Sequence, residues 1–138
     1  MTHQKSAITG TPTPEVKLLG FQHVQLAIPP GGEELARRFY GEILGMDEID
    51  KPPVLAARGG CWFSLGEVQI HLGVEDDFRP AAKAHPGILV DDIATAAERL
   101  AAYKCDVDWD ANLPGYRRFY TQDLHRNRIE LLEPSSDA

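Results

Sequence analysis

The sequence of 138 residues has only two cysteines, Cys61 and Cys105, too few for a disulfide framework or a cysteine-rich zinc site. It has no apolar run long enough to span a bilayer, and its first residues lack a charged-then-apolar signal pattern. It also lacks a basic excess, because the net charge is -7 and its lysines and arginines are not clustered beyond short pairs. A nucleic-acid binder needs a positive surface. We therefore expect a cytoplasmic protein with reduced thiols and neither membrane nor nucleic-acid partners.

The composition fits one globular domain preceded by a short arm. A hydrophobic fraction of 43% and a charged fraction of 25% are typical of soluble domains, and the length suffices for one core. Residues 1–17 are polar and contain Pro12 and Pro14, which predicts a flexible N-terminal arm. The ordered domain is expected over residues 18–134.

Hydrophobic periodicity predicts the order strand, helix, three strands, and the same order a second time. The expected elements are a strand at 21–28, a helix at 33–44, strands at 46–50, 61–65 and 68–74, a strand at 85–90, a helix from Asp91 or Asp92 through Ala101, and strands at 107–109, 117–121 and 128–132. This pattern indicates an α+β protein of two βαβββ modules, about 18–75 and about 81–134.

Four of these strands carry one strong metal ligand on the face opposite their aliphatic side chains. The ligands are His23, His71, His85 and Glu130. Three imidazoles and one carboxylate suit a divalent Zn, Fe, Mn, Co or Ni ion. Each residue taken singly also fits an ordinary polar position on a strand, so the repeated placement is what favours a site for one metal ion.

The same alternation indicates further residues of a cavity. Phe119 is expected to face the helix, which turns Arg118 and Tyr120 towards the ligand face. Arg118 either binds an anionic group of a substrate or forms an ion pair with Glu130. Trp62, opposite the apolar side chains of its strand, lines the cavity or simply packs there.

The stretches FQHVQLAIP, EELARRFYGEILGM, VQIHLG, AHPGILVDD and NRIELLEP, spanning residues 21–134, resemble the vicinal-oxygen-chelate (VOC) superfamily. This superfamily includes glyoxalase I, epimerases, fosfomycin-resistance enzymes, extradiol dioxygenases and bleomycin-binding proteins. The resemblance implies the glyoxalase/bleomycin resistance/dihydroxybiphenyl dioxygenase fold, in which paired βαβββ modules enclose a metal and substrate cavity. Matched by motif, the superfamily's ligand positions fall on His23, His71, His85 and Glu130, and its members commonly form homodimers, sometimes by sharing modules between chains.

Two departures from the superfamily pattern stand out. Glyoxalase I usually has Glu where this chain has His71, which bears on the substrate class. The turn at residues 123–127 lacks the usual glycine, so we expect a positive φ or local strain at Arg126. His125, in the same turn, is expected to be exposed to solvent.

The expected function is that of a metal-dependent enzyme performing Lewis-acid lyase or isomerase chemistry on a small, oxygen-rich organic substrate, with Glu130 as candidate base. An octahedral ion with four protein ligands keeps two open positions, whereas a ring-opening dioxygenase needs three. The alternatives are an extradiol-type Fe(II) dioxygenase using His23, His85 and Glu130, a metal-free antibiotic-binding protein, or a catalytically silent domain.

Overall fold

The computed structural model describes residue 10 and residues 12–136. Most of the arm predicted over residues 1–17 therefore lies outside the described residues, and residues 12–17 belong to no helix or strand. Module one contains β1 (His23–Ile28), α1 (Glu33–Ala36), the π-helix η1 (Arg37–Ile43), β2 (Asp47–Ile49), α2 (Pro53–Ala56), β3 (Cys61–Leu65) and β4 (Val68–Val74). Module two contains β5 (Gly87–Leu89), α3 (Ile93–Ala102), β6 (Asp108–Asp110), β7 (Tyr116–Gln122) and β8 (Arg128–Pro134).

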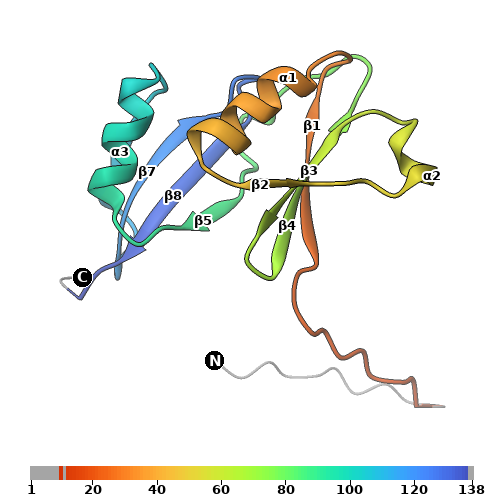
Figure 1. Ribbon diagram of the computed structural model, residues 1–138. Coiled ribbons are helices and arrows are strands. Elements are labelled where there is room, and N and C mark those ends of the chain that lie inside the picture. Colours follow the sequence, from red (N-terminus) through yellow and green to blue (C-terminus); the bar gives the residue numbers. More distant parts are fainter. Residues whose placement is uncertain (1–9, 11, 137–138) are drawn as a thin grey trace.

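The two modules form two four-stranded mixed sheets with the same topology (Figure 1). The strand orders are β1-β4-β3-β2, here called sheet A, and β5-β8-β7-β6, here called sheet B. In each sheet the first and last strands of the module pair in parallel, with His23 opposite Gln69 and Gly87 opposite Glu130. Neither sheet closes into a barrel. The duplicated α+β architecture predicted from the sequence is therefore confirmed.

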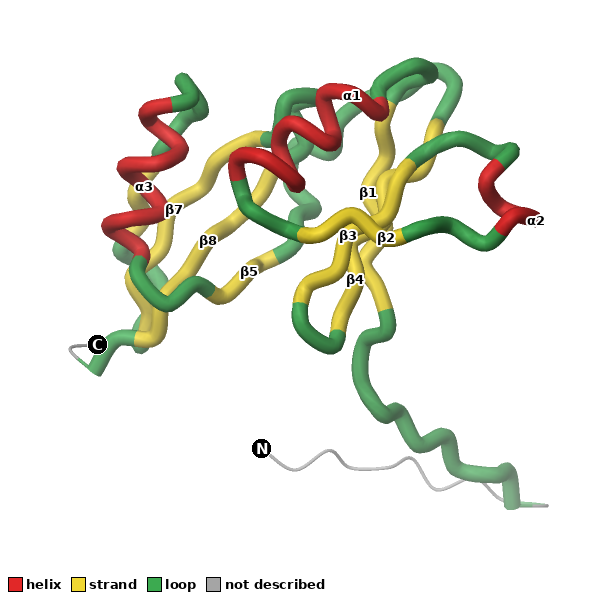
Figure 2. The backbone as a smooth tube through the Cα atoms, in the orientation of Figure 1, coloured by secondary structure: helices red, strands yellow, loops and turns green. Residues whose placement is uncertain are grey.

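Helices from both modules pack on one side of the sheets and join them into one core. η1 packs against β2 and β3, and α3 packs against β7 and β8 (Figure 2). Arg99 of α3 donates hydrogen bonds to the carbonyl oxygens of Ile43 and Glu42 at the end of η1, at 2.6 and 2.8 Å. Among the described residues, no helix has both the length and the apolar character needed to cross a membrane.

The helix predicted over residues 33–44 is correct in position, but only its first turn is α-helical. From Arg37 onward the bonding is that of a π-helix, and the amide of Leu44 donates to the carbonyl of Phe39 at 2.9 Å. The wider π turn accompanies the complete burial of two consecutive aromatic side chains, Phe39 and Tyr40.

The observed strand boundaries differ most from the predicted ones where a proline or an exposed residue interrupts the pairing of strands. β3 and β4 match the prediction, but β1 begins at His23 rather than Phe21, whose side chain is exposed. β5 begins at Gly87 rather than at residue 85, since Pro86 has no amide hydrogen for the ladder. His85 therefore lies just before β5. The short helix α2, with Pro53 at its first turn, was not predicted.

A buried polar network ties the β7–β8 turn to module one. Asp123 accepts hydrogen bonds from the Tyr40 hydroxyl at 2.7 Å and from the Asn127 side-chain amide at 2.9 Å, and that amide also donates to the carbonyl of Ala27. The prediction that His125 is exposed is wrong, because it is half-buried and its Nε2 lies 2.8 Å from the Gly32 carbonyl oxygen. Arg126 has the expected positive φ, at 71°.

Candidate functional site

On sheet A the two predicted ligands His23 and His71 lie on adjacent parallel strands and touch. Their rings stack with centroids 4.1 Å apart and an angle of 11° between planes. Trp62, across from His71 on β3, stacks on the imidazole at 3.8 Å. Because β4 lies between β1 and β3, the His71 ring is held between an imidazole and an indole. The alternation of side chains along β3 had correctly predicted that Trp62 lies on this face.

The surroundings of His71 keep its imidazole neutral. Its side chain is buried, with the residue only 4% exposed, and Nε2 lies 2.7 Å from Oε1 of Gln69. Burial, with smaller effects from the charges of His23 and Lys51, lowers the pKa of His71 to about 4. At neutral pH the ring therefore carries a lone pair for ligation. His23, at the edge of the sheet, is exposed.

On sheet B the other two predicted ligands also form a pair. His85 Nε2 lies 3.0 Å from Oε1 of Glu130, whose residue is only 7% exposed. The second carboxylate oxygen, Oε2, accepts a hydrogen bond from Nη1 of Arg118 at 2.9 Å. Both oxygens of this buried carboxylate are thus satisfied by neighbouring side chains on the same face.

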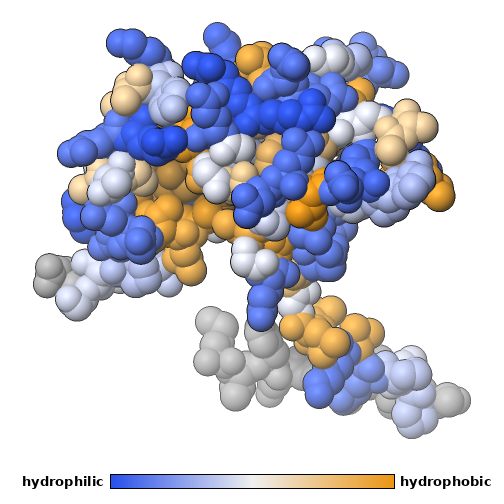
Figure 3. Space-filling model, viewed as in Figure 1, coloured by the Kyte–Doolittle hydropathy of each residue, from blue (hydrophilic) through white to orange (hydrophobic). Residues whose placement is uncertain are grey.

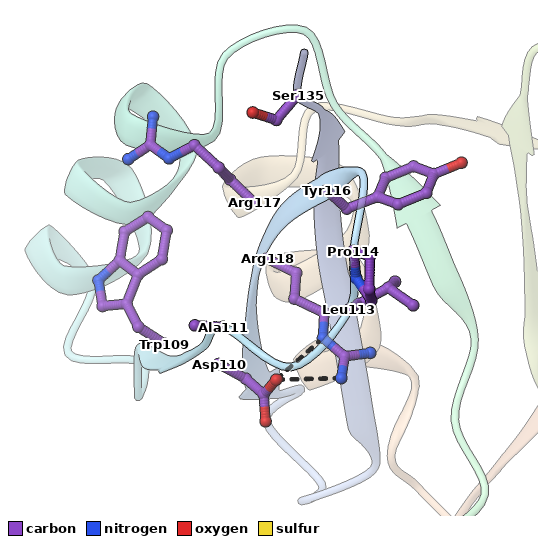
Figure 4. A pocket seen from close by; sticks show the side chains of 9 residues that line it. All are labelled: Trp109, Asp110, Ala111, Leu113, Pro114, Tyr116, Arg117, Arg118 and Ser135. Atoms are coloured by element: carbon purple, nitrogen blue, oxygen red, sulfur yellow. Dashed lines mark hydrogen bonds and ion pairs between the residues drawn. The ribbon is translucent and has the colours of Figure 1, made fainter. Parts of the chain in front are cut away.

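Arg118 forms the ion pair with Glu130 that was one of its two predicted roles, and it forms a second one. Its Nη2 lies 3.0 Å from Oδ1 of Asp110 on β6. The hydrogen bond to Glu130 is the largest effect raising the pKa of Arg118. Figure 4 shows Arg118 and Asp110 pointing towards each other at a hollow of about 610 Å³, while Arg117 lies beside Trp109.

Tyr120, predicted to face the cavity, connects the His85–Glu130 pair to two arginines. The edge of its ring meets His85 at a centroid distance of 5.3 Å. The guanidinium carbons of Arg118 and Arg128 lie 5.2 and 4.0 Å from its centroid. Arg128 was not predicted as a site residue, although it lies two positions from Glu130 and so on the same face of β8. The same alternation places Gln69 on the face of β4 that carries His71.

A single chain presents the predicted ligands as two separate pairs. His23 and His71 meet on sheet A with Trp62, and His85 and Glu130 meet on sheet B with Arg118 and Tyr120. Within residues 10 and 12–136, no three His, Cys, Asp or Glu side chains form a cluster that could hold a metal ion. The two pairs occupy equivalent places. His23 lies in the first strand of module one and His85 lies two residues before the first strand of module two, and each contacts a side chain of its module's last strand.

No family model and no curated protein matches the sequence of this chain. Among solved structures, a protein from Bacillus anthracis assigned to the glyoxalase family shares 45% identity over 88% of this chain and 99% of its own, with a TM-score of 0.85. An antibiotic binding protein from Streptomyces is 24% identical over 88% of this chain and 100% of its own, with a TM-score of 0.68. A lactoylglutathione lyase from Agrobacterium tumefaciens is 20% identical over 83% and 92%, with a TM-score of 0.63. The last two show likeness in fold alone.

Proposed function

Because the chain belongs to the glyoxalase family of the VOC superfamily, we propose that it is a metal-dependent enzyme. Its proposed reaction is a lyase or isomerase reaction on a small, oxygen-rich organic substrate. The observation that carries the proposal is the pairing of His23 with His71 and of His85 with Glu130 at equivalent places in the two sheets. Together the two pairs offer the four donors of one metal site, and surface histidines placed singly would not need this symmetry.

The four side chains fit a divalent ion chemically. Imidazole and carboxylate are the donors that zinc, iron, manganese, cobalt and nickel accept, and His71 is neutral at physiological pH. Partners around the donors fit as well, since Gln69 contacts His71 and Arg118 contacts Glu130. Such contacts orient ligands and tune their basicity.

We propose that two copies of the chain complete the site, with sheet A of one facing sheet B of the other. The ligand faces lie opposite the helices, and β1, β2, β5 and β6 are edge strands. Large apolar side chains are also exposed: Val16, Leu18, Leu19 and Phe21 before β1, and Leu89 in β5, are 64–90% exposed. Figure 3 shows apolar residues gathered below the polar helical layer and along the N-terminal segment. Exposed apolar surface of this kind favours an interface between protein chains.

A bound ion with four protein ligands would polarise a substrate carbonyl and leave two positions for neighbouring substrate oxygens. Glu130 is the only carboxylate of the four, and we propose that it would dissociate transiently from a bound ion and accept the substrate proton at Oε1, the oxygen that contacts His85. Arg118 holds the other oxygen of Glu130 and so fixes the direction of the carboxylate. Trp62 forms a flat apolar wall beside His71.

Metal content tests the proposal directly. The purified protein, reconstituted with each candidate metal, is expected to hold one ion per chain by elemental analysis. His85→Ala should weaken affinity at least about tenfold, because a ligand is lost. Gln25→Ala is a matched control, since it lies on the face and strand of His23 but is not a ligand. A protein that binds no metal after reconstitution would contradict the proposal and favour a metal-free binding protein.

Mixing two defective variants tests whether the site is shared. In His71→Ala the sheet A pair is broken, and in Glu130→Ala the sheet B pair is broken. If the site is shared, chain exchange gives mixed dimers with one intact site, restoring about a quarter of all sites. Neither variant alone should show such sites. If mixing restores no metal binding while light scattering shows dimers, the shared site is refuted.

A second candidate function rests on the double stacking of His71. Its ring is held on both faces, and Nε2 already contacts Gln69, which fits a packing role as well as a ligand role. Without His71 the donors are two histidines and one carboxylate, an arrangement that suits an Fe(II) dioxygenase. Unchanged metal affinity in His71→Ala, together with turnover that stops without O₂, would establish this alternative.

A further inference from the structure

The two arginines beside Tyr120 differ in how many of their N–H donors already have a partner. Arg118 is held by two carboxylates, Glu130 and Asp110. Arg128 is half-buried and donates one hydrogen bond, from Nη1 to the carbonyl oxygen of Lys83 at 3.2 Å. No carboxylate partner of Arg128 occurs in the part of the chain that the structure describes. Since a guanidinium carries five N–H donors, most of those on Arg128 remain available.

Stacking fixes the direction of the Arg128 guanidinium. Its carbon lies 4.0 Å from the centroid of the Tyr120 ring, so the group lies against the ring and its edge is held in place. A guanidinium held in this way loses little freedom when it binds a carboxylate or phosphate through two parallel hydrogen bonds. Arg128 therefore has both the free donors and the fixed orientation of an oxyanion receptor.

A hollow of about 400 Å³ lies beside this receptor, and its lining carries a positive excess. Arg126 and Arg128 both line it, together with Tyr120 and one carboxylate, Asp108. Arg126 has a φ of 71°, a region that disfavours residues with a side chain and is commonly occupied by glycine. An arginine in a strained conformation at the rim of a hollow is expected where its charge is used.

We infer that Arg128, stacked on Tyr120 and assisted by Arg126, forms a subsite for an oxyanion group of the substrate, a carboxylate or a phosphate. Arg128 and Glu130 lie two residues apart on one face of β8, about 7 Å along the strand. The inference rests on the proposed function and narrows it to substrates with an anionic group about this far from the reacting oxygens. It also assigns to Arg128 the anion-binding role that the sequence suggested for Arg118.

The subsite can be tested without metal or substrate. Calorimetric titration of the full chain in EDTA, with inorganic phosphate and with acetate as probes, is expected to detect millimolar binding of at least one. Arg128→Met should weaken that binding about tenfold or more, and Arg128→Lys, which keeps the charge but loses the planar fork, by less. Arg126→Gly should weaken it about threefold while raising the melting temperature, because the strained φ is relieved. Tighter binding of phosphate or of acetate identifies the group that the subsite prefers.

Arg117→Met is the matched control, because Arg117 stacks on Trp109 at 5.7 Å on the opposite face of β7. It should leave binding unchanged. Unchanged affinity in Arg128→Met, an equal loss in Arg117→Met, or no binding of either probe up to about 50 mM would each overturn the inference. Metal content measured on separate portions of the same preparations, reconstituted with metal in the absence of EDTA, separates the two proposals. Retained metal with no anion binding removes only the subsite, and anion binding without metal removes only the metal-dependent function.

Discussion

Replacing Tyr40 by phenylalanine removes one hydroxyl from the network that joins the two modules. That hydroxyl donates to Asp123 at 2.7 Å, and both side chains are buried. A hydrogen bond to a charged group is worth about 1.5–3 kcal/mol. The same carboxylate oxygen keeps its bond from Asn127, so we expect a loss of about 2 kcal/mol, within this range. For a chain of this length that corresponds to a melting temperature lower by about 6 °C.

The Tyr40 variant should also change how stability depends on pH. Burial, and then the charge of Asp123, raises the pKa of Tyr40 well above 10.0. A group with a raised folded-state pKa contributes stability that is complete below its unfolded pKa, here about 10, and is lost as pH rises above it. The wild type should therefore lose up to about 1.4 kcal/mol more per pH unit than Tyr40→Phe above pH 10.

Urea denaturation at about pH 7 and about pH 11 measures both effects. The difference between wild type and Tyr40→Phe should be largest at neutral pH and narrow in alkali. Tyr116→Phe, at a more exposed tyrosine, should change neither value. Equal stability of Tyr40→Phe and wild type at neutral pH would refute the role assigned to this hydroxyl.

Three further substitutions or probes test the fold around sheet A. Gly60→Ala should cost about 3 kcal/mol or more in urea denaturation, because φ is +85° and a Cβ would lie 2.2 Å from the Leu72 carbonyl oxygen. The amide of Gly60 lowers the pKa of Glu33, so the wild type should lose more stability than Glu33→Gln as pH falls below about 4.5. Burial raises the pKa of Cys61 to about 11, so in native protein at about pH 8 Cys61 should react with Ellman's reagent far more slowly than Cys105, and a fast Cys61 would contradict this.

Much of the fold was predictable because it depends on local alternation. β3 and β4 follow strict patterns closed by glycine turns, and their bounds were predicted to the residue. The π-helix was not predicted, because the pattern around Phe39 and Tyr40 also suits an α-helix. Only the packed core shows that both rings are buried together. The exposure predicted for His125 failed for a similar reason: its partner, the Gly32 carbonyl, lies 93 residues away in sequence.

The sequence predicted which candidate-site residues share a face of one sheet, but not how the two faces lie relative to each other. Parity showed which side chains share a face of one sheet, and so identified His71 with Trp62 and Glu130 with Arg118. It says nothing about how two sheets lie relative to each other, because that depends on helix contacts such as Arg99 with the end of η1. The separation of the ligands into two pairs required the structure.

The two ligand faces are chemically unlike, and this favours pairing one with the other in the proposed dimer. Sheet A presents stacked rings, with His71 between His23 and Trp62. Sheet B presents charge, with Glu130 and the arginines beside Tyr120. Facing two B sheets would leave a metal without His23 and His71, and facing two A sheets would leave it without a carboxylate. The proposed arrangement would give each site four donors and would place an anionic substrate group on the B side and an apolar part against Trp62. If mixed His71→Ala and Glu130→Ala chains fail to regain metal, this complementarity does not assemble the site.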